Sequence, residues 1–156
     1  MKAYKVVSIA LYIFVVIVMI SLGVRFISAT EYFSYHAQAA GTEWSTIDAG
    51  LRLVYLAVFK VCGAAILSLC VCMLTMIVVP FAGSSQRWSY FAIPIVGMCF
   101  WSITLATTLH VTRTTPAEAP WTGSLACVLV ILVAFAFSMA ERSMASGKGI
   151  LKSADG

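Results

Sequence analysis

The chain has 156 residues, of which 62% are hydrophobic and 10% are charged, and its formal net charge is +4. An ordinary soluble domain is roughly 45–50% apolar and about 25% charged. This composition, with a mean hydropathy of +0.99, excludes a water-soluble globule because the excess apolar surface needs lipid as its solvent. The Lys and Arg residues are dispersed, which excludes a nucleic-acid-binding stripe. The length predicts one domain.

The first apolar segment covers residues 6–24, between Lys5 and Arg25. As a helix it would measure about 28 Å, close to the thickness of the hydrocarbon layer. A cleaved signal peptide is the alternative, because Lys2 and Lys5 precede the segment. However, the segment exceeds the usual length of about 7–15 residues, and Arg25 interrupts the approach to a cleavage site. We therefore expect a retained transmembrane helix at about 5–28.

A polar loop, residues 29–50, follows this helix and contains carboxylates, a histidine and several aromatic residues. Ser45 and Asp48 have the spacing of a capping box, with Asp48 in place of the usual Glu. Arg52 is expected to pair with Asp48 at the i, i+4 spacing. We expect this loop to form a short structured cap.

Three further apolar segments predict helices at about 51–82, 88–112 and 121–141. The second helix would measure about 48 Å, which exceeds the hydrocarbon layer by about ten residues. Pro94 is placed to kink the third helix. The transmembrane domain is therefore expected at 1–142, with a disordered cytoplasmic tail at 143–156.

Orientation is predicted from the Lys and Arg residues near the helix ends. With a cytoplasmic N-terminus, the inner side carries Lys2, Lys5, Arg87, Arg142, Lys148 and Lys152. The outer side then carries Arg25, Arg52 and Arg113. This bias favours cytoplasmic N- and C-termini, and it places the loop at 29–50 outside the cell membrane.

Lys60 interrupts the second apolar segment, and two interpretations of it are open. A charged residue inside a membrane helix is by default a candidate functional group, which would face the bundle and pair with a loop carboxylate such as Glu31. Alternatively, hydrocarbon begins near Val61, and Lys60 extends its ammonium group to the outer interface.

His36 and His110 are the two histidines, and both map to the outer side. Nothing in their spacing requires a metal, so no metal site and no cofactor are predicted. The five cysteines all fall in apolar segments, where they are expected to act as small packing residues. No catalytic motif is present, and no catalytic residue is predicted.

Several short segments resemble a known group of proteins. They are Tyr35-His36-Ala37, Gly41 with Trp44, Asp48-Ala49-Gly50-Leu51, Val79-Pro80-Phe81 and Arg87-Trp88. Together they resemble small uncharacterised bacterial four-helix membrane proteins, and the layout is similar to the broader DoxX-like set. The resemblance covers residues 25–121 and implies four helices in a bacterial inner membrane. DoxX-like proteins are linked in part to quinone or thiol redox systems, but this chain lacks the C-x-x-C motif.

The sequence predicts an all-α polytopic membrane protein, an antiparallel bundle of four transmembrane helices with a short extracytoplasmic cap. We expect a non-catalytic accessory or binding subunit with an outward-facing polar pocket. The residues expected to line that pocket are Arg25, Glu31, His36, Lys60 and His110. Two alternatives stay open: a redox or isomerase-type enzyme acting on a lipid or quinone, and a component of an oligomeric transporter. The expected partners are the lipid bilayer, a lipid or quinone, and other membrane subunits or further copies of the chain.

Overall fold

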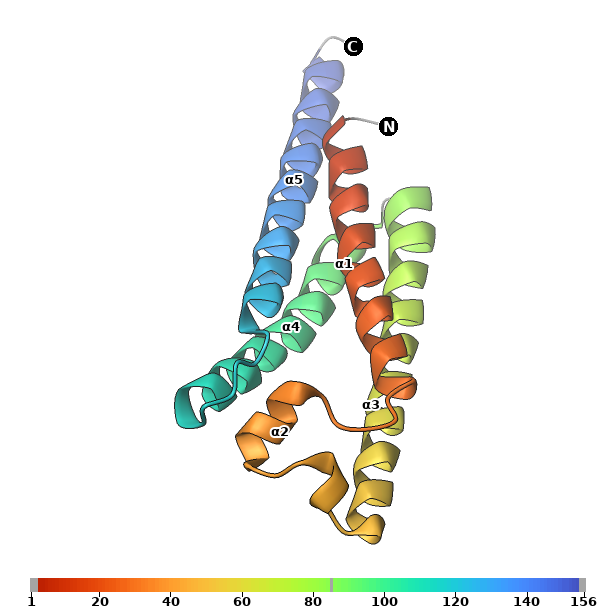
Figure 1. Ribbon diagram of the computed structural model, residues 1–156. Helices are drawn as coiled ribbons and strands as arrows, with labels where there is room; N and C mark the ends of the chain where they lie inside the picture. The colour runs from red at the N-terminus through yellow and green to blue at the C-terminus, as the bar shows by residue number, and fades with distance from the viewer. Residues whose placement is uncertain (1–2, 85, 155–156) are drawn as a thin grey trace.

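The computed structural model describes residues 3–84 and 86–154, with side chains described up to residue 144. Within these residues the chain is entirely helical apart from turns and loops (Figure 1). The elements in order are α1 (Ala3–Ile27), α2 (Ser34–Ala40), η1 (Trp44–Thr46), α3 (Ala49–Met76), η2 (Ile77–Gly83), α4 (Ser89–Thr114) and α5 (Trp121–Ala154). The element η2 is a π-helical continuation of α3 that contains Pro80.

Four long apolar helices confirm the predicted all-α membrane fold. In the described part of the chain, the segments long and apolar enough to cross a membrane are Ala3–Ile27, Ala49–Gly83, Ser89–Thr114 and Trp121–Met144. Consecutive spans run in opposite directions, so the start of α1 and the end of α5 lie at the same end of the bundle, opposite α2 (Figure 1). The helix α1 packs against α3 and α5, and α4 packs against α5. This arrangement is the antiparallel packing that the sequence predicts.

The closest approach between α1 and α3 occurs at two glycines. A Cβ atom at Gly63 would lie 2.7 Å from the carbonyl oxygen of Gly23 and 2.9 Å from the backbone nitrogen of Ile27. A Cβ atom at Gly23 would lie 3.2 Å from the carbonyl oxygen of Gly63. The two backbones are therefore in direct contact, as small residues permit in membrane helices. This contact fixes the height of α3 relative to α1.

A second contact aligns the same pair at the other end of the bundle. The ammonium group of Lys5 donates to the carbonyl oxygen of Ala82 at 3.2 Å. The helical rise gives about 27 Å from Lys5 to Gly23 and about 28 Å from Gly63 to Ala82. Both values approach the hydrocarbon thickness of about 30 Å. The two contacts therefore mark the approximate boundaries of the hydrocarbon layer.

The surplus length of α3 lies at one end of this layer. From Gly63 back to Ala49, α3 continues for about 21 Å past its contact with Gly23, whereas α1 ends four residues after that glycine, at Ile27. This projecting part of α3 meets the loop between α1 and α3, which contains α2 and η1 (Figure 1). We call this loop, residues 28–48, the cap.

The start of α3 differs from the predicted capping box. Asp48 itself is the N-cap residue, and its carboxylate accepts from the backbone nitrogens of Gly50 (2.8 Å) and Leu51 (3.4 Å). Ser45 lies within η1 instead. The guanidinium of Arg52 donates to the carbonyl oxygens of Ile47 (2.8 Å) and Ser45 (2.6 Å). Arg52 thus connects η1 to α3 through two backbone carbonyl oxygens, in place of the expected pair with the carboxylate of Asp48.

The last helix, α5, runs from Trp121 to Ala154, and its apolar span is Trp121–Met144. The end of the transmembrane domain at residue 142 and the disordered tail at 143–156 stay predictions. Residues 155–156 of the predicted tail lie outside the described residues.

The contact between Gly23 and Gly63 leads to a prediction about stability. Gly63→Ala should lower the free energy of unfolding by about 1–3 kcal/mol, because the added methyl group overpacks two backbones. Gly123→Ala is the matched control, since a Cβ there meets nothing within 4 Å and alanine favours a helix. Thermal unfolding in detergent would measure both, and equal stability of the two variants would contradict the assigned contact.

Candidate functional site

The cap is held together by a few local contacts. The helix α2 ends at Gly41, whose φ of 62° is the left-handed conformation that glycine tolerates. The hydroxyl of Tyr32 donates to the carbonyl oxygen of Thr42. The ring of Tyr32 also packs edge-on against Trp44, with 5.1 Å between centroids. These contacts fold residues 32–44 into a compact loop.

An aromatic wall joins the cap to the membrane helices. Phe33 lies between Phe26 at the end of α1 (5.2 Å) and Phe59 of α3 (5.3 Å). His36 on α2 packs on Phe33 at 5.6 Å and on Phe59 at 5.3 Å. Phe59 is buried although it lies on the projecting part of α3. This wall separates two cavities, one on each side.

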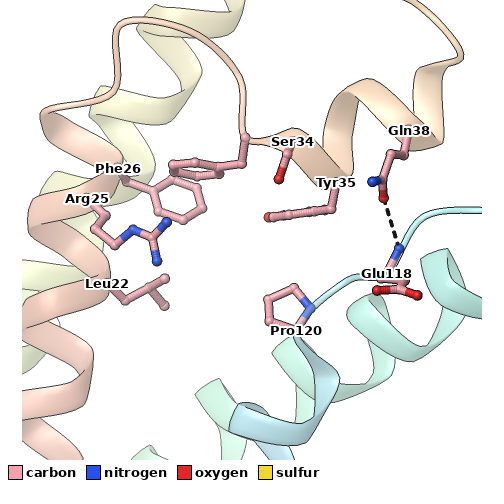
Figure 2. A pocket seen from close by; sticks show the side chains of 9 residues that line it. Leu22, Arg25, Phe26, Ser34, Tyr35, Gln38, Glu118 and Pro120 are labelled. Atoms are coloured by element: carbon pink, nitrogen blue, oxygen red, sulfur yellow. Dashed lines mark hydrogen bonds between the residues drawn. The ribbon is translucent and has the colours of Figure 1, made fainter.

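The first cavity, which we call the boundary cavity, has a volume of about 390 Å³. It lies between the end of α1, the cap helix α2 and the loop that leads into α5 (Figure 2). The side chains that line it are Leu22, Arg25, Phe26, Phe33, Ser34, Tyr35, Gln38, Glu118 and Pro120. Leu22 adjoins Gly23 at the hydrocarbon boundary, so the cavity extends from apolar residues at that depth to polar residues above it.

The second cavity, which we call the histidine cavity, lies between α2 and the projecting part of α3. Its volume is also about 390 Å³, and its lining is mostly apolar. The residues that line it are Tyr32, His36, Ala39, Ala40, Ile47, Tyr55, Val58 and Phe59. A third, more open depression of about 350 Å³ brings Arg25 and Glu31 to one surface.

Arg25 lines both the boundary cavity and the open depression. Its guanidinium lies 5.4 Å from the ring centroid of Phe33, a cation–π contact. No described carboxylate, that of Glu31 included, lies within ion-pair distance of Arg25. Tyr35 is half-buried near Arg25: burial raises the pKa of its phenol, and the positive charge of Arg25 partly opposes that shift. Arg25 thus holds a positive charge at the boundary of the hydrocarbon layer.

His36 is neutral at physiological pH in this environment. Burial lowers the pKa of its imidazole from 6.5, because a charged ring loses hydration among aromatic neighbours. Its Nδ1 atom is buried and has no hydrogen-bond partner. Protonation would therefore place a charge on a nitrogen without an acceptor.

The five predicted site residues are not gathered in one pocket. Arg25 and Glu31 share the open depression, while His36 lines the histidine cavity. Lys60 and His110 are exposed and line none of these three cavities. Lys60 lies three residues beyond Gly63, at the hydrocarbon boundary, with its side chain directed away from the bundle. The interpretation in which Lys60 extends its ammonium group to the membrane interface stays a prediction.

Of the nine residues that line the boundary cavity, the sequence predicted Arg25 as a site residue, and it did not indicate the other eight, which include Gln38 and Glu118. Gln38 Oε1 accepts from the backbone nitrogen of Glu118 at 3.2 Å, which links α2 to the loop between α4 and α5 (Figure 2). The predicted topology offered one signal for this contact, because it places the loop between α4 and α5 on the same side of the membrane as the cap. The packing of one loop against the other was not visible in either loop alone.

Comparison with known proteins places the chain in no family. No family model, no curated protein and no solved structure matches it. The resemblance to DoxX-like proteins therefore receives no support beyond the shared four-helix layout. Among the described residues, no group of three or more His, Cys, Asp or Glu side chains is placed to hold a metal ion.

The buried imidazole makes the cap sensitive to acid. Because the pKa of His36 is lowered from 6.5, an opened cap binds more protons than a closed one once the pH falls below that value. The closed cap is therefore most stable above pH 6.5 and loses stability as the pH falls toward the lowered pKa. Fluorescence of Trp44, in a chain with the other tryptophans replaced by Phe, should report opening as the pH falls below about 6.5, the ordinary pKa of an imidazole.

Two variants test the assignment of this pH dependence. His36→Phe keeps an aromatic ring in the wall and removes the titrating group, so the fluorescence change should disappear. His110→Gln removes the exposed histidine of α4 and should leave the change intact. A pH response that survives in His36→Phe would show that another group is responsible.

Proposed function

We propose that this multi-pass membrane protein is a non-catalytic binding subunit that holds an amphipathic molecule in the boundary cavity. The observation that carries the proposal is the lining of that cavity, which begins at Leu22, beside the Gly23 contact where we place the hydrocarbon boundary, and reaches the polar groups of the cap. Leu22 and Pro120 provide apolar contacts on its membrane side, and Arg25 and Gln38 provide polar groups nearer the cap; Phe26 follows Arg25 along α1 (Figure 2). A molecule with an apolar tail and a polar head matches this order of residues.

The dimensions of the cavity support the same class of ligand. Its volume of about 390 Å³ lies within the usual range of about 300–1,000 Å³ for small-molecule sites. The lining comes from three separate parts of the chain, which Gln38 and Glu118 connect. Such a site is assembled only in the folded protein, so ligand binding is coupled to folding of the cap.

A membrane enzyme acting on a lipid or quinone is the second candidate, and the histidine cavity is the observation in its favour. The imidazole of His36, a group suited to general acid–base catalysis, borders a mostly apolar space together with Tyr32 and Tyr55. Lys60 does not reach this space. Turnover of an added quinone or lipid that ceased in His36→Phe would favour the enzyme over the binding subunit.

We further propose that the cap faces away from the cytoplasm and that both chain ends lie inside, in a bacterial inner membrane. The distribution of Lys and Arg supports the orientation, and the resemblance in layout alone supports the compartment. In a chain without its native cysteines, Thr30→Cys should react with a membrane-impermeant maleimide in intact cells. Ser143→Cys should react only after permeabilisation. The reverse pattern would invert the orientation.

The binding proposal predicts that filling the cavity removes the ligand. Ser34 lines the boundary cavity, and Ser34→Trp should reduce the amount of co-purifying lipid or quinone by about tenfold, which corresponds to about 1.4 kcal/mol of lost binding. Ser45→Trp is the matched control, because Ser45 is exposed on the same cap and lines none of the described cavities. Mass spectrometry of molecules extracted from the purified protein would measure both. Equal retention in the two variants would argue against the cavity.

A further inference from the structure

The boundary cavity carries one charge of each sign, on opposite sides. Arg25 extends from the end of α1, whereas Glu118 comes from the loop before α5 (Figure 2). We propose that the cavity binds the headgroup of a zwitterionic phospholipid, with the phosphate at Arg25 and the ammonium group at Glu118. This inference rests on the proposed binding function and specifies its ligand.

The side of the cavity near α1 suits a phosphate group. The guanidinium of Arg25 is exposed and has no carboxylate partner among the described residues, so its donors are available to a ligand. Arginine is the residue best matched to phosphate oxygens in two parallel hydrogen bonds. The hydroxyl of Ser34 lines the same cavity. The phenol of Tyr35, whose pKa is raised, keeps its proton at neutral pH and adds a third donor.

The opposite side suits an ammonium group. The carboxylate of Glu118 is exposed, and among the described residues it makes no ion pair. Its backbone is held in place, because Ala117 and Ala119 on either side are 2% and 5% exposed. The backbone nitrogen of Glu118 donates to Gln38 Oε1 at 3.2 Å. With its backbone held in this way, Glu118 offers carboxylate acceptors for the three N–H donors of an ammonium group.

The pair of charges distinguishes between lipid classes. A purely anionic headgroup would satisfy Arg25 and be repelled by Glu118, whereas a purely cationic one would satisfy Glu118 and be repelled by Arg25. A headgroup with both charges satisfies both residues. The apolar contacts of Leu22 and Pro120 lie where the glycerol and the first part of the acyl chains would enter the bilayer.

The experiment compares two lipids on the intact protein. The purified chain is exchanged into mixed micelles with equal amounts of phosphatidylethanolamine and phosphatidylglycerol, and native mass spectrometry counts the lipids that stay bound. Wild type should retain phosphatidylethanolamine about tenfold better. Arg25→Gln should reduce retention of both lipids, and Arg25→Lys should restore part of it. Glu118→Gln should remove the preference or reverse it toward phosphatidylglycerol.

Matched controls keep charge effects of the whole protein apart from effects of the cavity. Arg113→Gln removes an exposed positive charge from the last turn of α4, at the same end of the bundle. Glu43→Gln removes an exposed carboxylate from the cap. Both variants should behave as wild type. A variant is compared with wild type only if its circular dichroism spectrum and its elution volume in size-exclusion chromatography are unchanged. If Arg25→Gln fails to fold, Arg25→Lys provides the test.

A competition experiment and the Ser34→Trp variant distinguish the possible outcomes. Water-soluble glycerophosphoethanolamine should compete weakly if a membrane lipid is the ligand, and full competition would show that a free headgroup is sufficient and overturn the lipid assignment. Equal retention of both lipids by wild type, or an unchanged preference in Glu118→Gln, overturns the headgroup inference. If Ser34→Trp still removes a bound molecule in that case, the proposed binding function survives. If wild type retains no molecule and Ser34→Trp changes nothing, both proposals fail.

Discussion

The contact between Gly23 and Gly63 is the constraint on which the rest of this structure depends. It brings the backbones of α1 and α3 together at a point where no side chain fits, and it thereby fixes how far α3 extends beyond α1. With Lys5 bonded to Ala82 at the other end, the shared part of the two helices matches the hydrocarbon thickness. All of the surplus length of α3 is therefore placed on one side, beneath the cap.

The projecting part of α3 gives the cap a surface to fold against. Phe59 is the residue that connects them, because it contacts Phe26, Phe33 and His36 at nearly equal distances. The resulting aromatic wall divides the space below α2 into a polar cavity toward α1 and α5 and an apolar cavity toward α3. Aromatic residues are favoured at this depth because one part of each ring system meets hydrocarbon and another meets water. The charged residues of the polar cavity lie where lipid headgroups lie.

The candidate site could be predicted in part. The overlong second helix and the polar loop before it point to this region, and Arg25, Glu31 and His36 lie there. The sequence also predicts Lys60 and His110 as pocket residues, because they belong to the same end of the bundle. Helical rotation separates them: Phe59 faces the cap, and Lys60, the next residue, points about 100° away from it. Shared height in the membrane does not imply a shared face of the helix.

By itself, the sequence determined that the chain needs lipid as its solvent, how many helices can cross the membrane, that they run antiparallel and that α3 is longer than the hydrocarbon layer. These properties follow from the length of the apolar segments and from the spacing of polar residues. Only the tertiary structure decided which side chains meet. The guanidinium of Arg52 donates to the carbonyl oxygens of Ser45 and Ile47 rather than to the carboxylate of Asp48, and Gln38 meets the distant Glu118. These pairings depend on how helices rotate and cross when small residues such as Gly23 and Gly63 allow close contact. Periodicity in a single segment carries no information about that rotation.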